Sequence, residues 1–414
     1  MKRMLMHGHG ELLQTAVQED GRLVEFYMER SENSGLVGSI YKGRVVNVLP
    51  GMQAAFVDIG LGKNAFLYID DLLHPHLERQ PEQKPLIQQL IRPGAELLVQ
   101  VMKEPLGGKG ARVTTHFSLP GRWLVFMPIA GYVGVSKKVA TENERNRLRQ
   151  IGERLRQGEE GIIMRTNADG EPEQALASDV EQLRSLWNGI RLRAEEASVP
   201  SELHREAGLM RRVVRDALTA DMNELWIDDA SRYEEAKALL QELTPQLVHR
   251  LRLYDRNADI SLFTEYGVTE QANAAFQPRI QLDSGGSLIW DETEALTVID
   301  VNTGKYTGDT DLEDTVFKTN LEAADEIARL LRIRDVGGII IVDFIDMENE
   351  TNREKVMNRL AERMKQDRTK STVLGWTRLG LLELTRKKAR ENAVQQLTVR
   401  CAACAGTGKK TTTI

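Results

Sequence analysis

The sequence predicts an α/β protein of several domains that includes a small all-β barrel. The chain has 414 residues, too many for one small core, which indicates two to four domains. Two apolar runs, residues 296–304 and 339–346, flank a helical stretch, as in a strand–helix–strand unit with parallel strands. Residues 35–117 alternate short strands with glycine-rich turns, which is typical of a barrel.

Composition limits the class of protein further. The hydrophobic content of 41% and charged content of 28% are ordinary for a soluble globular protein. No apolar run approaches the ~20 residues that span a bilayer, and the N-terminus lacks the apolar core of a signal peptide. Two cysteines argue against a disulfide scaffold. We expect a cytoplasmic protein with no membrane-spanning segment.

The N-terminal residues predict a β-hairpin, since two alternating runs, residues 12–17 and 23–28, flank the turn Glu19-Asp20-Gly21. A hairpin alone is marginally stable and needs partners. Strands predicted at residues 225–227 and 248–254 could complete its sheet, and the residues between would then be insertions.

The barrel is predicted from five strands, at residues 40–49, 54–59, 65–68, 96–103 and 111–115. Phe56 and Phe66 alternate with small residues on adjacent strands, and Tyr41 to Arg44 add aromatic and basic groups. Aromatic side chains beside cations stack unpaired bases on barrel faces. Alternatively these aromatics fill the barrel core, and for Phe56 the alternation leaves both interpretations open.

Residues 118–211 mix strands with two helices. Thr141 and Glu144 form a capping box, and Leu148 and Ile151 follow at helical spacing, so we expect them in a core. A strand near residues 162–164 ends in Arg165-Thr166. An arginine beside a hydroxyl at a strand end could hold a phosphate by a bidentate contact.

Carboxylates end both apolar runs. Parallel strands bring their carboxyl ends to one edge of a sheet, so Asp300, Asn302 and Asp343 could form an oxygen-rich cluster. Hard oxygen ligands suit magnesium or manganese. The alternative is that these residues are helix caps or turn residues. We expect Asp346 to cap the following helix.

Residues 351–400 carry 13 Lys/Arg against 5 Asp/Glu, although the whole chain has a net charge of −6. A basic stretch beside an acidic strand pair suits a polyanion, and a solvated helix face is the alternative.

Cys401 and Cys404 provide half of a tetrahedral zinc site, which a second chain could complete. A redox dithiol and a site completed by histidine are the alternatives.

Together these motifs resemble the RNase E/G family of bacterial endoribonucleases over nearly the whole chain. The matching segments are residues 284–287, 293–296, 299–302, 319–329, 335–338, 342–347 and the Cys-x-x-Cys-x-Gly-x-Gly of residues 401–408. The resemblance implies an RNase H-like domain (1–34 and 212–275), an inserted OB-fold RNA-binding barrel (35–117) and 5′-phosphate sensor (118–211), a DNase I-like catalytic domain (276–398) and a zinc-link with tail (399–414).

The resemblance also assigns site residues. Asp300, Asn302 and Asp343 would be catalytic, and Asp300 and Asp343 would hold magnesium. The RNA-binding residues would be Phe56, Phe66 and Lys109. The 5′-phosphate sensor would comprise Gly121, Val125, Arg165 and Thr166. Cys401 and Cys404 would share a structural zinc between the chains of a homodimer.

The activity that the resemblance implies is magnesium-dependent endonucleolytic cleavage of single-stranded RNA, yielding 5′-phosphomonoesters and preferring 5′-monophosphorylated ends. The implied roles are rRNA and tRNA processing and mRNA decay. The alternatives are a metal-dependent nuclease that also cleaves DNA and a noncatalytic RNA-binding scaffold.

Two departures from the family pattern concern the end of the chain. Ala402 replaces the usual proline, for which we expect only a modest change in loop stiffness. Longer members continue into a domain that joins dimers into tetramers, whereas this sequence ends at Ile414. We therefore expect a homodimer, with a higher oligomer as the alternative.

Overall fold

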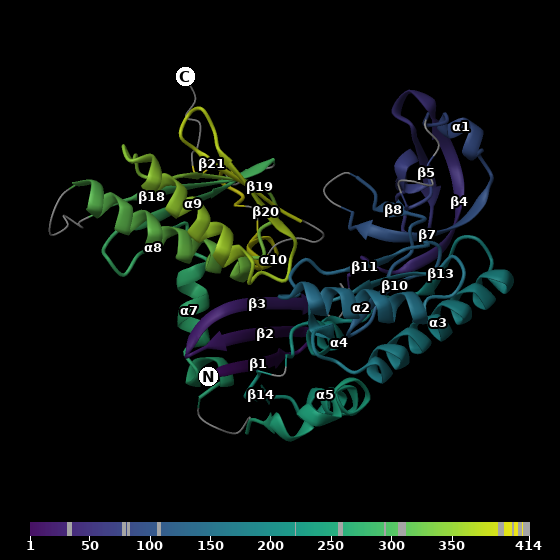
Figure 1. Ribbon diagram of the computed structural model, residues 1–414, viewed down its shortest axis with the longest axis horizontal. Coiled ribbons are helices and arrows are strands. Elements are labelled where there is room, and N and C mark those ends of the chain that lie inside the picture. Colours follow the sequence, from purple (N-terminus) through teal and green to yellow (C-terminus); the bar gives the residue numbers. More distant parts are fainter. Residues whose placement is uncertain are drawn as a thin grey trace. The chain divides into compact units, whose positions relative to one another are not determined.

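Figure 1 shows the computed structural model of the chain. It describes all residues except 31–34, 77–79, 81–82, 106–108, 220, 256–259, 294, 305–311, 388–392, 400, 405–407 and 409–414. Glu294 and Gly406, which carry part of the family resemblance, lie outside the described residues. The chain divides into two compact units, one of Met1–Arg30, Asp221–Glu235 and His249–Ile414, the other of Ser31–Ala220 and Ala236–Val248.

The first unit contains a five-stranded sheet around the N-terminus. Its order is β15 (Leu251–Leu253), β14 (Glu224–Ile227), β1 (Lys2–His9), β2 (Leu12–Glu19) and β3 (Arg22–Arg30). The expected hairpin is β2–β3, and the later strands do complete its sheet, because β14 pairs in parallel with β1 and β15 with β14. Sequence analysis did not find β1, whose Met4, Leu5 and Met6 are all buried.

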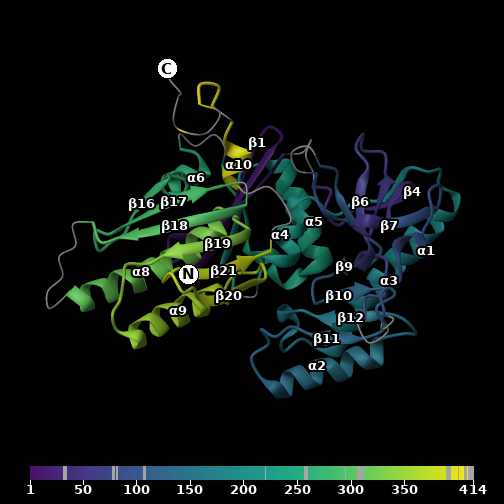
Figure 2. The ribbon, with the colours of Figure 1, turned by 90° about the horizontal axis from the view of Figure 1, so that it is seen from above.

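The same unit contains the sheet that carries the acidic strands. Its order is β16 (Arg279–Gln281), β17 (Ser287–Glu292), β18 (Leu296–Asn302), β19 (Gly338–Asp343), β21 (Leu382–Arg386) and β20 (Ser371–Trp376). β18 and β19 are parallel and are joined through α8 (Leu312–Ile333), so the predicted strand–helix–strand unit is confirmed. Figure 2 shows the strands in this order, with α9 (Glu350–Met364) beside α8.

Apolar runs such as residues 296–304 and 339–346 are typical of strands covered on both faces, yet only one face of this second sheet is well covered. Ile299, Ile340 and Val342 are fully buried and belong to the same apolar core as the inner residues of α8 and α9. On the opposite face Ile339 is 50% exposed. Alternation along β18 and β19 places Asp300 and Asp343 on this open face.

The second unit contains the closed barrel. Its strands follow the order β4 (Ile40–Leu49), β5 (Ala54–Asp58), β6 (Ala65–Tyr68), β8 (Arg112–Thr114) and β7 (Glu96–Lys103), and β7 pairs with β4 again. β6 and β8 are parallel, whereas the other neighbours in the ring are antiparallel. A five-stranded barrel is consistent with the expected OB-like architecture. The short α1 (Ile87–Leu90) lies between β6 and β7, and β13 (Ser201–His204) extends the sheet beyond β4.

A four-stranded sheet and three helices complete this unit. The sheet order is β11 (Val133–Val135), β12 (Gly161–Met164), β10 (Leu124–Met127) and β9 (Leu119–Pro120). The helices are α2 (Glu142–Leu155), α3 (Glu173–Glu196) and α4 (Leu209–Asp216). The expected cap of α2 is confirmed, because the Thr141 hydroxyl accepts a hydrogen bond from the Glu144 amide at 3.3 Å.

The remaining helices are short or shared between the units. They are α5 (Ala230–Leu243), α6 (Leu262–Glu265), α7 (Val268–Ala275) and α10 (Ala393–Leu397). None of the helices in the described residues is both long and apolar enough to cross a membrane.

Candidate functional sites

The first candidate site is the acidic edge of the β16–β20 sheet. Asp300 and Asp343 are direct partners in the parallel register of β18 and β19. The side-chain amide of Asn302 donates a hydrogen bond to Asp300 Oδ2 at 2.7 Å. Asn302 lies two residues beyond Asp300 and therefore on the same open face of the sheet. The three predicted residues thus lie together, on the side that solvent and a ligand can reach.

Like charges meet at this edge. Partial burial raises the pKa of Asp343 above its ordinary value, and the charges of Asp300 and Asp346 raise it further. Carboxylates that repel one another in this way favour either a shared proton or a bound cation. The oxygen donors fit a hard divalent ion such as magnesium, which commonly takes one or two carboxylates and keeps several waters.

The expectation that Asp346 caps the next helix is wrong. The N-cap of α9 is Asn349, whose side-chain oxygen accepts a hydrogen bond from the Thr351 amide at 2.9 Å. Asp346 instead adds negative charge near Asp343. No group of three His, Cys, Asp or Glu side chains that could hold a metal ion occurs among the described residues.

Replacing Asp343 with Asn should stabilise the free protein slightly at neutral pH. A carboxyl whose pKa is raised by folding binds its proton more tightly in the folded state, so ionising it costs stability as pH rises. Because Asp343 is exposed, we expect a gain of only about 1–3 °C in the unfolding temperature at pH 7. The gain should vanish below about pH 3.5, where the carboxyl is protonated in both states. Thermal unfolding across pH measures this, and an equal or lower unfolding temperature of the variant at pH 7 would contradict it.

The second candidate site is the outer face of the barrel. Ala55, Val57, Ala65 and Leu67 fill the barrel core. By strand alternation Phe56 and Phe66 therefore point outward, which settles the orientation that the sequence left open. The two rings are direct cross-strand partners, 6.0 Å apart between centroids in an edge-to-face arrangement.

Cations continue the row on which these rings lie. Phe66 is paired with Arg112 on β8, and Arg112 with Lys103 on β7. Arg112 is fixed in place by Asp71, 2.9 Å from its Nη2. Sequence analysis missed both cations because their alignment with the aromatic rings depends on the barrel register.

Lys109 and Tyr41 were also expected to contribute to this face of the barrel. Lys109 is exposed, and the adjacent Gly110 lies so close to Asn64 that a Cβ would be 2.1 Å from the Asn64 carbonyl oxygen. Lys109 is therefore held beside the start of β6, the strand that carries Phe66. Tyr41, by contrast, is buried in the core and its hydroxyl donates to Glu202 at 2.8 Å, so it does not contribute to the outer face.

The third candidate site surrounds Arg165 at the end of β12. The Arg165 guanidinium donates through Nη1 to the carbonyl oxygen of Gly121 at 2.6 Å. The Thr166 hydroxyl is exposed and lies 2.9 Å from the Ser136 hydroxyl. Val125 lies on β10, which pairs with β12 through Val125 and Ile163. The structure thus places Val125 on one small sheet and Gly121, Arg165 and Thr166 directly after its strands β9 and β12.

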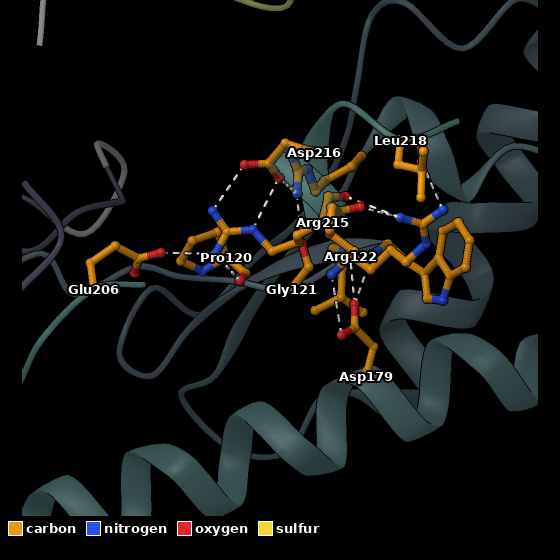
Figure 3. A network of polar contacts seen from close by, with 12 residues as sticks. Pro120, Gly121, Arg122, Asp179, Glu206, Arg215, Asp216 and Leu218 are labelled. Carbon is orange, nitrogen blue, oxygen red and sulfur yellow. Dashed lines mark hydrogen bonds and ion pairs between the residues drawn. The ribbon is translucent and has the colours of Figure 1, made fainter. Parts of the chain in front are cut away.

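A polar network supports this third site (Figure 3). The Asp179 carboxylate on α3 accepts hydrogen bonds from the backbone amides of Arg122, Trp123 and Leu124, at 3.3, 2.8 and 3.3 Å. Arg122 in turn donates to the Val214 and Leu218 carbonyl oxygens at the end of α4, both at 3.0 Å. The turn that contains Gly121 is therefore fixed to two helices.

The basic segment 351–400 is partly neutralised within the first unit. Arg359 and Arg363 on α9 both bind Asp325 on α8, at 2.7 and 2.8 Å. Arg353 stacks over the Trp376 ring, 4.9 Å from its centroid. Positive charge counted along the sequence therefore overstates what this segment can offer to a polyanion.

The cysteine pair lies near the end of the described chain. Cys401 is exposed and Cys404 half-buried, and the two are not joined by a disulfide. The backbone amides of Cys404 and Ala403, together with the Cys404 side chain, lower the pKa of the Cys401 thiol. This favours the thiolate, the form that binds metals.

The structure contains a closed barrel and a mixed sheet with a carboxylate pair at its edge. These features agree with the class of protein that the sequence comparisons identify, the ribonucleases. The profile of the Ribonuclease E/G family matches residues 118–389, more than half of the chain. The chain therefore belongs to the ribonuclease E/G family, and the resemblance drawn from the sequence is confirmed.

Curated relatives give the particular proteins to which the chain is similar. It is 43% identical to ribonuclease G of Escherichia coli K12 over 396 residues, which cover 94% of this chain and 80% of that protein. The identity to ribonuclease G of Haemophilus influenzae is also 43%, over 95% of this chain and 81% of the relative. Ribonuclease E of Nostoc is 40% identical over 90% of this chain and 54% of its own length.

Proposed function

We propose that this protein is an endoribonuclease that hydrolyses single-stranded RNA with the help of magnesium. The observation that carries the proposal is the register pair of Asp300 and Asp343, with Asn302 beside them on the open face of the sheet. The outer face of the barrel, with Phe56 and Phe66 next to cations, supplies a platform on which unpaired bases can stack.

At the acidic edge Asp300 and Asp343 would hold magnesium, whose chemistry is to polarise a phosphate oxygen and lower the pKa of bound water. Asn302 would orient the phosphate or the water through the amide oxygen that remains after its amide group binds Asp300. We infer products with a 5′-phosphate and a 3′-hydroxyl. The domain types would be those of the family, with an RNase H-like domain, an OB-fold barrel, a 5′-sensor and a DNase I-like domain.

A digest of single-stranded RNA and DNA, each with and without magnesium, tests the proposal. We expect cleavage of RNA that needs magnesium. Equal cleavage of DNA would favour a general metal-dependent nuclease, and binding without cleavage would favour a scaffold. Magnesium should also raise the unfolding temperature of the wild type more than that of Asp343→Asn, since a ligand that binds only the folded state stabilises it.

We also propose that the Arg165 site recognises a 5′-monophosphate, as the resemblance implies for Gly121, Val125, Arg165 and Thr166. Arg165 is a quarter exposed, so a phosphate can reach it. Arg165→Ala should abolish any preference for 5′-monophosphorylated over 5′-hydroxyl RNA of the same sequence. Comparison of the two initial rates measures this, and a preference that survives would place the phosphate pocket elsewhere.

Finally, we propose a cytoplasmic homodimer in which Cys401 and Cys404 of two chains share a structural zinc. The low-pKa thiol of Cys401 supports this ligand role. Replacing both cysteines with Ser should remove zinc and convert the dimer to monomer in native mass measurements. A dimer that persists without zinc would contradict the zinc-mediated assembly. Roles in rRNA and tRNA processing and mRNA decay remain part of the proposal.

A further inference from the structure

We propose that Asp216 is a positioning residue for the phosphate pocket, which holds Arg165 so that one edge of its guanidinium is ready for the ligand. This inference rests on the proposed role of Arg165 and adds the residue that prepares it. Asp216 is the last residue of α4, and nothing in the sequence motifs pointed to it.

The contacts of Arg165 are confined to one end of its guanidinium. Nη1 lies 2.6 Å from Asp216 Oδ1 and donates to the Gly121 carbonyl oxygen at 2.6 Å. Among the described residues, Nε and Nη2 of Arg165 make no hydrogen bond. These two groups form a parallel donor pair, the geometry with which arginine binds a phosphate in bidentate fashion.

Asp216 is itself held rigidly. Arg215 donates to both carboxylate oxygens, from Nε to Oδ1 at 3.0 Å and from Nη2 to Oδ2 at 2.9 Å. Burial alone would raise the pKa of Asp216, but the hydrogen bond and charge of Arg215 and the charge of Arg165 outweigh burial and lower it. The carboxylate therefore stays ionised between two guanidinium groups.

The anchor continues into the interior of the unit. Nη1 of Arg215 donates to Glu206 Oε1 at 2.8 Å and to the Pro120 carbonyl oxygen at 3.1 Å, and Figure 3 shows these contacts around the Asp216 carboxylate. Arg215 and Glu206 are both buried. Pro120 immediately precedes Gly121, so the Asp216–Arg215 pair and the backbone that receives Arg165 are fixed to each other.

Arg165 is therefore ordered before the ligand binds, so the entropy cost of immobilising its side chain does not weaken binding. A free arginine side chain loses much rotamer entropy when it is immobilised, and a site that is already ordered binds more tightly by the corresponding factor. In each of the pairs Arg165–Asp216 and Arg215–Glu206, the positive charge of the arginine is offset by the negative charge of the carboxylate. Recognition at this pocket would then depend on hydrogen-bond geometry more than on net positive charge.

Asp216→Asn tests the role of the carboxylate. The asparagine removes the charge and turns an NH₂ group toward one of the two guanidinium groups, where only an acceptor fits. We expect the ratio of cleavage rates on 5′-monophosphorylated and 5′-hydroxyl RNA to fall by about tenfold. Asp216→Glu keeps the charge but displaces the carboxylate by one methylene, and it should lower the ratio less. Thermal unfolding of both variants verifies that they are folded.

Matched controls separate this role from a purely structural one. Glu173→Gln breaks an exposed ion pair to Arg154 in the same unit, 2.7 Å long, and should leave the ratio unchanged. In an Arg165→Ala background, Asp216→Asn should have no further effect on the ratio, because it acts through Arg165.

Several outcomes would overturn the inference. An unchanged or higher ratio for Asp216→Asn would show that the carboxylate does not prepare Arg165, and an equal loss of cleavage on both RNAs would assign it a structural role. If Arg165→Ala abolishes the preference while Asp216→Asn preserves it, only this inference fails. If Arg165→Ala preserves the preference, the proposed phosphate pocket itself fails.

Discussion

Asp300→Asn is expected to reduce RNA cleavage by about a thousandfold or more, while RNA affinity changes by less than about threefold. The substitution removes one of two register-paired carboxylates and keeps the shape of the side chain. It therefore weakens the proposed magnesium site, while the proposed stacking surface for RNA lies on the barrel. Single-turnover cleavage and equilibrium binding to the same fluorescent RNA measure the two effects separately.

The control for this substitution is Asp291→Asn, an exposed carboxylate on the neighbouring β17. Asp291 pairs with Val298, two residues before Asp300, so the variant makes the same change of charge on the same sheet. We expect it to cleave RNA at the wild-type rate. If Asp300→Asn cleaves RNA at the wild-type rate, the acidic edge is not the active site.

Phe56→Ala and Phe66→Ala should each weaken binding of single-stranded RNA by about tenfold, because stacking of a base on an aromatic side chain contributes roughly 1–3 kcal/mol. Both rings are on the outer face, so their removal leaves the barrel core intact. The two rings contact each other, so the effects of the double variant should not be additive. Binding isotherms for a short unstructured RNA measure these losses.

An exposed apolar residue of the same barrel provides the control. Leu90 on α1 is 44% exposed, and Leu90→Ala should leave RNA affinity unchanged. A loss for Leu90→Ala equal to that for the phenylalanines would indicate general apolar contact, and no loss for either phenylalanine would place the RNA-binding surface elsewhere.

Patterns confined to short stretches of sequence located many of the elements correctly. The alternation of apolar residues located β2, β3 and the barrel strands, and the Thr141 capping box located the start of α2. The strand–helix–strand unit followed from apolar period and length, and its parallel pairing placed Asp300 opposite Asp343. These features depend on interactions between residues that are near in the chain or in adjacent strands.

Other features could not be found in this way because they depend on contacts across long separations. Arg112 joins the aromatic row only through the parallel pairing of β6 and β8. Asp216 meets Arg165 because α4 ends next to β12, 51 positions apart in the chain. Asp346 was wrongly predicted to cap α9. The cap is Asn349, because the loop before α9 is longer than expected, and no local pattern indicates its length.

Local sequence patterns predicted which residues would carry the chemistry, namely two carboxylates at strand ends, the aromatic pair of the barrel and the Arg165-Thr166 step. Which face each of these residues occupies depends on how the helices and strands pack in the fold. Because α8 and α9 pack on the same side of the sheet, the carboxylates lie on its open face, where a substrate can approach. Because the barrel closes through β4 and β7, Ala55 and Val57 face its core and Phe56 points outward. Burial is a property of the packed chain, and strand alternation alone does not indicate which face is covered.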